Sequence, residues 1–152
     1  MNKSRLYYLG KADDGFGWGV CNSNLQTALS EVCDLTVCTD ESRTEYDAPV
    51  FVPIANHELV PSVKCKAPIV IGYCFCEEPL GDEALENSKQ YDWIFAGSSW
   101  CASRLRAAGI VNVSRLVQGV DLTRFAPQPW PQNRGGFRVF SGGKYEFRKG
   151  QD

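Results

Sequence analysis

The sequence of 152 residues contains no hydrophobic run long enough to cross a bilayer. A membrane-spanning helix needs about 20 consecutive apolar residues, and the longest apolar runs, such as 67–72, are far shorter. The N-terminus lacks the pattern of a signal peptide, because the short apolar stretch from Leu6 to Leu9 ends at Gly10 and charged residues. We therefore expect a soluble, cytoplasmic protein with no membrane span.

Long runs of basic residues are also missing. The 16 Lys and Arg residues are balanced by 18 Asp and Glu residues, which gives a formal net charge of -2. Proteins that bind nucleic acid or anionic membranes usually concentrate positive charge, so neither partner is expected. With 43% hydrophobic and 22% charged residues, the chain has the composition of one ordinary globular domain rather than of a disordered segment.

Cysteines are plentiful, but the patterns that would pair them are absent. Their number, seven, is odd and no secretory signal precedes them, so a disulfide framework is not expected. Zinc sites usually need paired C-x2-4-C units, whereas the only close pair is Cys74 and Cys76, whose side chains would share one face of a strand. We expect buried free thiols and no metal site, with a metal or redox role as the alternative.

Short apolar runs alternate with helix-like segments along the chain. Helical spacing of Val20, Leu25, Ala28, Leu29 and Val32 predicts the first helix. This alternation predicts an α/β fold, a Rossmann-like three-layer sandwich with a mainly parallel sheet buried on both faces. Ligands of such folds bind at the carboxyl ends of the strands. The expected strands are 5–9, 35–39, 49–54, 68–72, 92–96 and 113–117, and the expected helices are 20–32, 82–89 and 100–108.

A glycine-rich loop follows the first predicted strand. Gly15, Gly17 and Gly19 would let backbone N–H groups approach a phosphate or a polar sugar, so they are candidate donor- or phosphate-binding residues. Trp18 between them is a candidate cleft-lining residue that could stack on a sugar ring. A surface turn is the alternative. An acid near the end of the second strand, Asp40, fits a dinucleotide-binding fold, but the G-x-G-x-G spacing disfavours a nucleotide-dependent oxidoreductase.

The most specific pattern lies between Tyr91 and Pro127. A predicted strand ends in Gly97-Ser98-Ser99, a helix and another strand follow, and the segment then reads Gln118-Gly119-Val120-Asp121 with Phe125 and Pro127. This stretch resembles the retaining group 1 (family 4-like) glycosyltransferases of the GT-B fold, in which a segment (Asn/Gln)-Gly-Val-Asp-x-x-x-Phe-x-Pro closes the N-terminal domain. The resemblance implies that five residues line the cleft: Ser98, Ser99, Gln118, Gly119 and Asp121.

A second stretch, 137–152, resembles the opening of that family's C-terminal domain. The resemblance implies that Lys144 and Lys149, with the adjacent Arg148, neutralise the diphosphate of the donor; a solvated basic turn is the alternative. It also implies three parts: an acceptor-side Rossmann-like domain at 1–127, a Pro/Gly linker at 128–136, and the beginning of a truncated donor-binding domain at 137–152.

The function implied by the resemblance is the transfer of a sugar from a nucleotide-diphosphate sugar to an unknown acceptor, with retention and with no metal or other cofactor. The chain alone would be inactive without the second domain. We expect the exposed cleft face to pair with that domain or to form a homodimer. The alternative is a non-catalytic Rossmann-like module that binds a sugar or a nucleotide.

The sequence gives only weak candidates for catalysis. Glu77 and Glu78 follow the strand predicted at 68–72 and could bind sugar hydroxyls or act as a base, although a solvated turn before Pro79 is the alternative. His57, the single histidine, follows the strand predicted at 49–54. The family often uses a histidine in the acceptor site, but nothing around His57 matches that motif, so a surface histidine is the favoured interpretation.

Overall fold

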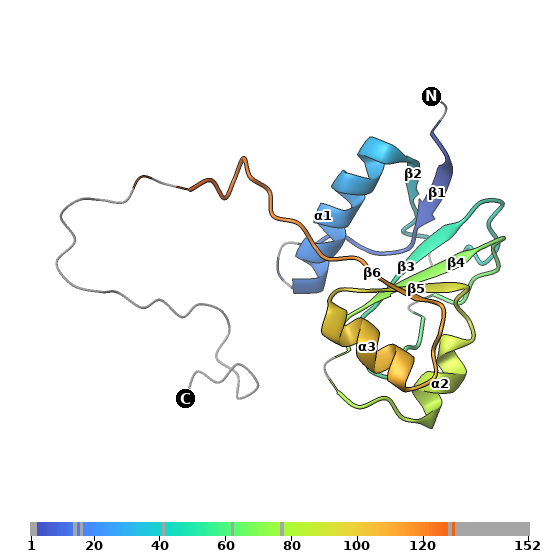
Figure 1. The fold of residues 1–152 in the computed structure, drawn as a ribbon. Helices are drawn as coiled ribbons and strands as arrows, with labels where there is room; N and C mark the ends of the chain where they lie inside the picture. Colours follow the sequence, from blue (N-terminus) through green and yellow to red (C-terminus); the bar gives the residue numbers. More distant parts are fainter. Residues whose placement is uncertain are drawn as a thin grey trace, which may run out of the picture. The chain divides into compact units, whose positions relative to one another are not determined.

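The structure is a computed structural model that describes residues 3–13, 15, 17–40, 42–61, 63–76, 78–127 and 129. A six-stranded sheet forms its centre, and three helices connect some of the strands (Figure 1). In chain order the elements are β1 (Arg5–Tyr8), α1 (Gly17–Val32), β2 (Asp34–Val37), β3 (Val50–Ile54), β4 (Val70–Cys74), α2 (Asp82–Ser88), β5 (Trp93–Ala96), α3 (Ser99–Ala107) and β6 (Val113–Arg115).

The strands all run parallel in the order β2-β1-β3-β4-β5-β6. After β1 the chain adds β2 on one side, then returns to add β3 on the other side of β1, and every later strand continues outward from β3. The direction of strand addition therefore reverses between β1 and β3, which is the topological switch point of an open parallel sheet. The prediction of a Rossmann-like α/β sandwich is confirmed.

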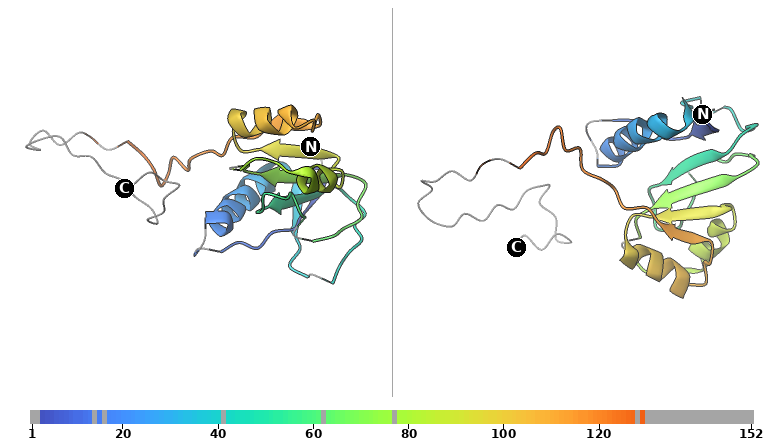
Figure 2. Two further views of the ribbon diagram at one scale, coloured as in Figure 1. Left: turned by 90° about the horizontal axis from the view of Figure 1, so that it is seen from below. Right: turned by 45° about the horizontal axis from the view of Figure 1, so that its top comes forward.

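The helices cover both faces of the sheet. Figure 2 shows α1 on one side of the strands and α3 on the other. Tyr8, Phe51 and Tyr73 pack towards α1 in one cluster of buried side chains. A larger cluster on the opposite face joins the alternate strand residues, such as Val52 and Ile94, to α2 and α3. This alternation follows from the two-residue period of a strand.

The helix α1 begins at Gly17, within the stretch predicted as loop. The side chains that it packs against the sheet are Trp18, Cys21, Leu25 and Leu29, which recur every three or four residues and so lie on one helical face. Two valines of the predicted periodicity, Val20 and Val32, are 41% and 68% exposed. The first turn is helical because Trp18 anchors it on the sheet, a contact that a glycine-rich sequence does not reveal.

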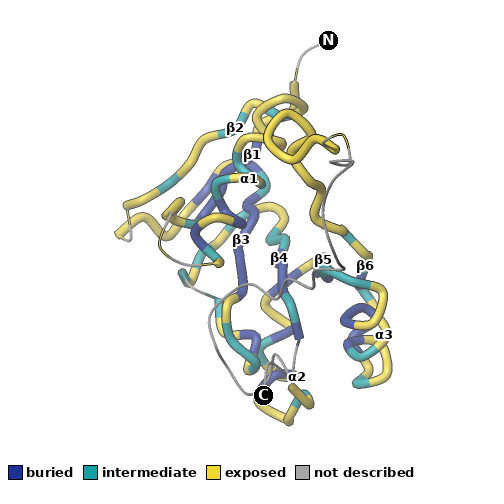
Figure 3. Tube along the Cα trace, turned by 90° about the vertical axis from the view of Figure 1, so that its left-hand side faces the viewer, coloured by how far each residue is buried: buried dark blue, intermediate teal, exposed yellow. Residues whose placement is uncertain are grey.

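The expectation that the strands are buried on both faces holds for β3 and is wrong for β2. Every residue of β3 is buried, and Figure 3 shows this strand at the centre of the sheet. The strand β2 is exposed or half-buried throughout, and Val37 is 41% exposed. The difference arises because β2 is the edge strand beyond β1.

The helix α3 begins at Ser99, one residue before the predicted start. Ser98 is its N-cap, and its Oγ accepts a hydrogen bond of 3.0 Å from the backbone N–H of Cys101. The helix ends before Gly109, which has a φ of +93°. Glycine adopts this left-handed conformation at little cost. The cap fixes the direction in which α3 leaves the carboxyl end of β5.

The chain divides into two compact units, Met1–Gln118 and Gly119–Asp152. The first unit contains the whole sheet. The predicted linker at 128–136, except residue 129, and the predicted second domain at 137–152 lie outside the described residues. In the part of the chain that is described, no helix is both long and apolar enough to span a membrane.

Candidate functional site

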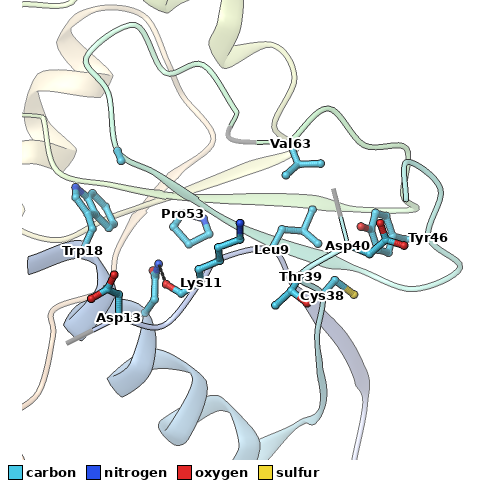
Figure 4. A pocket seen from close by; sticks show the side chains of 14 residues that line it. Leu9, Lys11, Asp13, Trp18, Cys38, Thr39, Asp40, Tyr46, Pro53 and Val63 are labelled. Atoms are coloured by element: carbon cyan, nitrogen blue, oxygen red, sulfur yellow. Dashed lines mark hydrogen bonds between the residues drawn. The ribbon is translucent and has the colours of Figure 1, made fainter. Parts of the chain in front are cut away.

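A pocket of about 360 Å³ lies at the switch point of the sheet. Residues that follow β1, β2 and β3 line it, together with the first turns of α1. Figure 4 shows Trp18 and Asp13 at one end of the pocket and Asp40 with Tyr46 at the other, with Lys11 and Pro53 between them. This is the place where open parallel sheets bind their ligands, and the volume is near the lower end of about 300–1,000 Å³ for small-molecule sites.

The loop between β1 and α1 is held in place by two side chains of the helix. Asn22, which is buried, donates from Nδ2 to the carbonyl oxygen of Lys11 at 2.9 Å and accepts a hydrogen bond of 3.0 Å from the hydroxyl of Tyr8. Gln26 donates to the carbonyl oxygen of Gly10 at 2.8 Å. These bonds hold Gly10 and Lys11, which line the pocket, in position without a ligand.

The three glycines of the predicted loop have different roles. A Cβ at Gly19 would collide with the backbone of Asp13, so only glycine lets the loop lie against α1 there. Gly17 has open space around it and begins the helix, and the backbone N–H of Gly15 donates to the carboxylate of Asp13. Of the three, Gly19 lines the pocket; direct contact with a phosphate stays a prediction for all of them.

The charged side chains that line the pocket carry more negative than positive charge. Among its described lining residues, Lys11 is the cation and Asp13 and Asp40 are the carboxylates. Asp13 accepts a hydrogen bond from the N–H of Gly15 just before α1 begins. Its carboxylate therefore lies at the position where the N-terminus of a helix would favour a bound anion. Hydrogen bonds from the hydroxyl and N–H of Ser42 lower the pKa of Asp40 below its ordinary value.

The tryptophan predicted to line the cleft does line this pocket. Trp18 is half-buried and packs edge-on against Tyr73, with ring centroids 6.4 Å apart, and at a tilt against Phe75 at 5.3 Å. Its indole is thus supported from the side of the sheet. An apolar wall beside a few polar groups is the usual composition of a ligand pocket.

Three further predicted cleft residues in the first unit are engaged elsewhere. The Oγ of Ser98 caps α3, and the Oγ of Ser99 accepts a hydrogen bond of 3.0 Å from Arg115. Gln118 donates from its side chain to the sulfur of Cys21 in α1. They are not among the residues that line the switch-point pocket, so their contact with a ligand stays a prediction.

Gly119 and Asp121 belong to the second unit. The Oδ1 of Asp121 accepts hydrogen bonds from the N–H and the hydroxyl of Thr123, at 2.9 and 2.7 Å. These bonds lower the pKa of Asp121 and close a turn within its own segment. The prediction that both residues face a cleft remains a prediction.

A histidine and a glutamate meet after β3 and β4. Nε2 of His57 lies 3.5 Å from Oε1 of Glu78; the sequence favours a surface histidine for His57 and gives Glu78 as a weak catalytic candidate, and does not pair them. Nδ1 of His57 is buried and has no hydrogen-bond partner within the described part of the chain. The remaining predicted site residues, Glu77, Lys144, Arg148 and Lys149, lie outside the described residues.

Sequence reasoning did not select Lys11, Asp13 or Thr39 as pocket residues. Their signal is positional, since they directly follow β1 and β2, and parallel strands that flank a switch point bring such residues together. The strand order that identifies the switch point is not visible in the sequence.

Comparisons with known proteins identify no relative. No family model matches the chain, and searches of curated proteins and of solved structures returned no match.

Proposed function

We propose that this chain is the acceptor-side domain of a nucleotide-sugar-dependent glycosyltransferase. The observation that carries the proposal is the preorganised pocket at the switch point, with its aromatic wall and its excess of carboxylates. The sequence pattern from Gln118 to Pro127, which resembles that of GT-B glycosyltransferases, supports the same function. The reaction would move a sugar from a nucleotide diphosphate to an acceptor hydroxyl.

The charge and size of the pocket support an acceptor rather than a donor as its ligand. A nucleotide diphosphate is strongly anionic and would meet Asp13 and Asp40 there, whereas the hydroxyls of a saccharide can donate hydrogen bonds to both carboxylates. A volume of about 360 Å³ suits a ligand of about one sugar ring better than a whole nucleotide sugar. In this proposal the donor diphosphate is bound by Lys144, Arg148 and Lys149, which supply the positive charge that the pocket lacks.

The chemical step needs a group that accepts the proton of the attacking hydroxyl. The acceptor oxygen bonds to the anomeric carbon as the bond to the nucleotide diphosphate breaks. His57 and Glu78 are a suitable acid–base pair, since they follow β3 and β4 at the ligand-binding edge of the sheet. Glu78, a weak catalytic candidate in the sequence analysis, thus remains a candidate, and His57 is its partner.

The proposal is tested by isothermal titration of the 152-residue chain with a panel of monosaccharides and nucleotide-diphosphate sugars. The same panel is titrated into a longer protein that carries a donor-binding domain after residue 152. Saccharide binding to both proteins, with nucleotide-sugar binding to the longer one alone, supports the proposed division of labour. Tight nucleotide-sugar binding to the shorter chain contradicts it.

A second candidate, a non-catalytic module that binds a nucleotide, is favoured by the position of Asp40. This residue follows β2 and lines the same pocket as the glycine loop, where dinucleotide-binding folds place the acid that binds a ribose hydroxyl. If this is the function, the chain alone binds a nucleotide and Asp40→Asn weakens that binding at least tenfold. An Asp40→Asn variant that binds nucleotides as the parent does would exclude it.

A further inference from the structure

Three cysteine side chains converge in the core at the carboxyl end of the sheet. Cys74 ends β4, Cys76 follows two residues later, and Cys101 lies in the first turn of α3. Their exposed fractions are 0%, 3% and 2%. The sulfur atoms of Cys74 and Cys76 are 3.8 Å apart, and all three sulfurs lie within 4.8 Å of one another. The cluster is separate from the switch-point pocket, whose lining includes none of these cysteines.

The backbone around the cluster holds the third sulfur in position. The N–H of Cys76 donates to the Sγ of Cys101 at 3.1 Å, and the N–H of Gly97 donates to the carbonyl oxygen of Cys74 at 3.0 Å. A Cβ at Gly97 would collide with the ring of Phe75, so glycine is required where the turn before α3 passes over the Cys74–Cys76 segment. The fold therefore builds the cluster with specific contacts, and the backbone donor at Cys101 suits a charged sulfur.

The spacing of the sulfurs is that of ligands around one metal ion. With a metal–sulfur bond of about 2.3 Å, two sulfurs of a tetrahedral or trigonal site lie about 3.8–4.0 Å apart. The two sulfurs of Cys74 and Cys76, 3.8 Å apart, already have this separation. Because all three sulfurs lie within 4.8 Å of one another, the third sulfur would need to move only a short distance to bind the same ion.

We propose that Cys74, Cys76 and Cys101 bind one thiophilic metal ion with a filled d shell, Cu⁺ in preference to Zn²⁺. Thiolates select such soft ions. Structural zinc is almost always held by four ligands, and within the described residues the cluster offers three. Binding replaces thiol protons by the metal and releases them to solvent, with no change in the oxidation state of copper or sulfur.

A positive charge beside the cluster offsets part of the thiolate charge. Arg104, one turn after Cys101 on α3, acts electrostatically on Cys76. Its guanidinium stacks on the ring of Trp100 at 4.8 Å, and its Nε is buried with no hydrogen-bond partner in the described part of the chain. A cation held beside Cys76 reduces the cost of placing a thiolate there.

The test loads the full chain with Cu⁺, and separately with Zn²⁺, under anaerobic conditions with a phosphine reductant. After desalting, the metal per chain is measured for the parent, for Cys101→Ser and for Cys33→Ser, a cysteine outside the cluster. One equivalent of Cu⁺ on the parent and on Cys33→Ser, with at least a tenfold loss on Cys101→Ser, is the expected result. Equal retention by all three proteins overturns the site, and retention of Zn²⁺ without Cu⁺ overturns the preference.

A second measurement avoids any effect of a substitution on folding. X-ray absorption at the copper edge of the loaded parent protein counts the neighbours of the metal. Three sulfur neighbours at about 2.3 Å support the proposal. Two or fewer sulfurs, or nitrogen and oxygen neighbours in their place, contradict it.

Discussion

The hydroxyl of Tyr8 on β1 donates a hydrogen bond of 3.0 Å to Oδ1 of Asn22 on α1, and both residues are buried. The same amide donates from Nδ2 to the carbonyl oxygen of Lys11. One side chain thereby joins the first strand, the loop after it and the first helix. The shape of the pocket depends on this connection, because Lys11 lies in the loop that lines it.

Replacement of Asn22 by alanine is expected to destabilise the fold and to loosen the pocket. The change removes the hydrogen bonds of the amide to Tyr8 and Lys11, and loss of the bond to the buried Tyr8 hydroxyl costs about 1–3 kcal/mol. Urea denaturation measures the free energy of unfolding. Asn24→Ala, at an exposed position of the same helix, is the matched control. Equal stability of the two variants would contradict the role given to Asn22.

Two glycines of α1 are expected to respond in opposite ways to alanine. In Gly17→Ala the new Cβ meets open space, so the better helix propensity of alanine stabilises the fold by up to about 1 kcal/mol. In Gly19→Ala the Cβ collides with the backbone of Asp13, so the variant is expected to be destabilised and to bind the pocket ligand more weakly. Thermal unfolding of both variants checks the pair, and a more stable Gly19→Ala would show that the loop is not packed as described.

The sequence predicts the parallel α/β fold well because its strands are short apolar runs and its helices begin or end at strong local signals. The helix α3 lies within one residue of the predicted 100–108, with Ser98 as its N-cap and Gly109 after its end. The start of α1 is missed because the anchor of its first turn is a tertiary contact, Trp18 on Phe75. The exposure of β2 is missed because the order of strands in the sheet depends on long-range pairing.

The candidate site is predicted in part, for the same reason. Trp18 and Gly19, which the sequence singles out, lie in the lining of the pocket, and their contact with a ligand stays a prediction; the charged residues Lys11 and Asp13 carry no motif. The sequence reveals only part of the thiol cluster, because Cys74 and Cys76 form a recognisable pair. Cys101 joins them only after α3 folds back onto the sheet, 25 residues from Cys76.

The protein is expected to lose stability steeply in alkaline solution. Burial raises the pKa of Tyr8, Tyr73 and Tyr91 above the ordinary value of 10.0. Above about pH 10 the unfolded chain releases these protons while the folded chain keeps them, so each tyrosine lowers the free energy of unfolding by up to about 1.4 kcal/mol per pH unit. Below pH 10 both states hold the protons and this dependence vanishes.

Tyr73→Phe isolates one of these groups. Its hydroxyl makes a long hydrogen bond of 3.4 Å to the carbonyl oxygen of Leu116, so loss of the hydroxyl is expected to perturb the fold little. The slope of unfolding free energy against pH above pH 10 should fall by about 1.4 kcal/mol per pH unit. Urea denaturation at several pH values measures the slope. A variant with the slope of the parent would show that Tyr73 ionises without unfolding.

Removal of the carboxylate of Asp13 should raise the affinity of the pocket for anions. Asp13→Asn deletes a negative charge beside the start of α1, and a charge interaction across about 4 Å in water is worth about 1 kcal/mol, or roughly a fivefold change in affinity. Titration with inorganic phosphate at low ionic strength measures the effect, with Asp34→Asn, on the edge strand β2, as the control. An unchanged phosphate affinity would mean that Asp13 does not shape the charge of the pocket.

The central claim is that the switch-point pocket binds the saccharide acceptor. Its most direct test is nuclear magnetic resonance titration of the 152-residue chain with monosaccharides and with nucleotide diphosphates, in which backbone amide shifts are followed residue by residue. We predict that a saccharide changes the amide chemical shifts of Gly10, Lys11 and Asp40, which line the pocket. Nucleotide diphosphates are predicted to leave these chemical shifts unchanged. Shifts of these amides by nucleotide diphosphates, with no response to any saccharide, would contradict it.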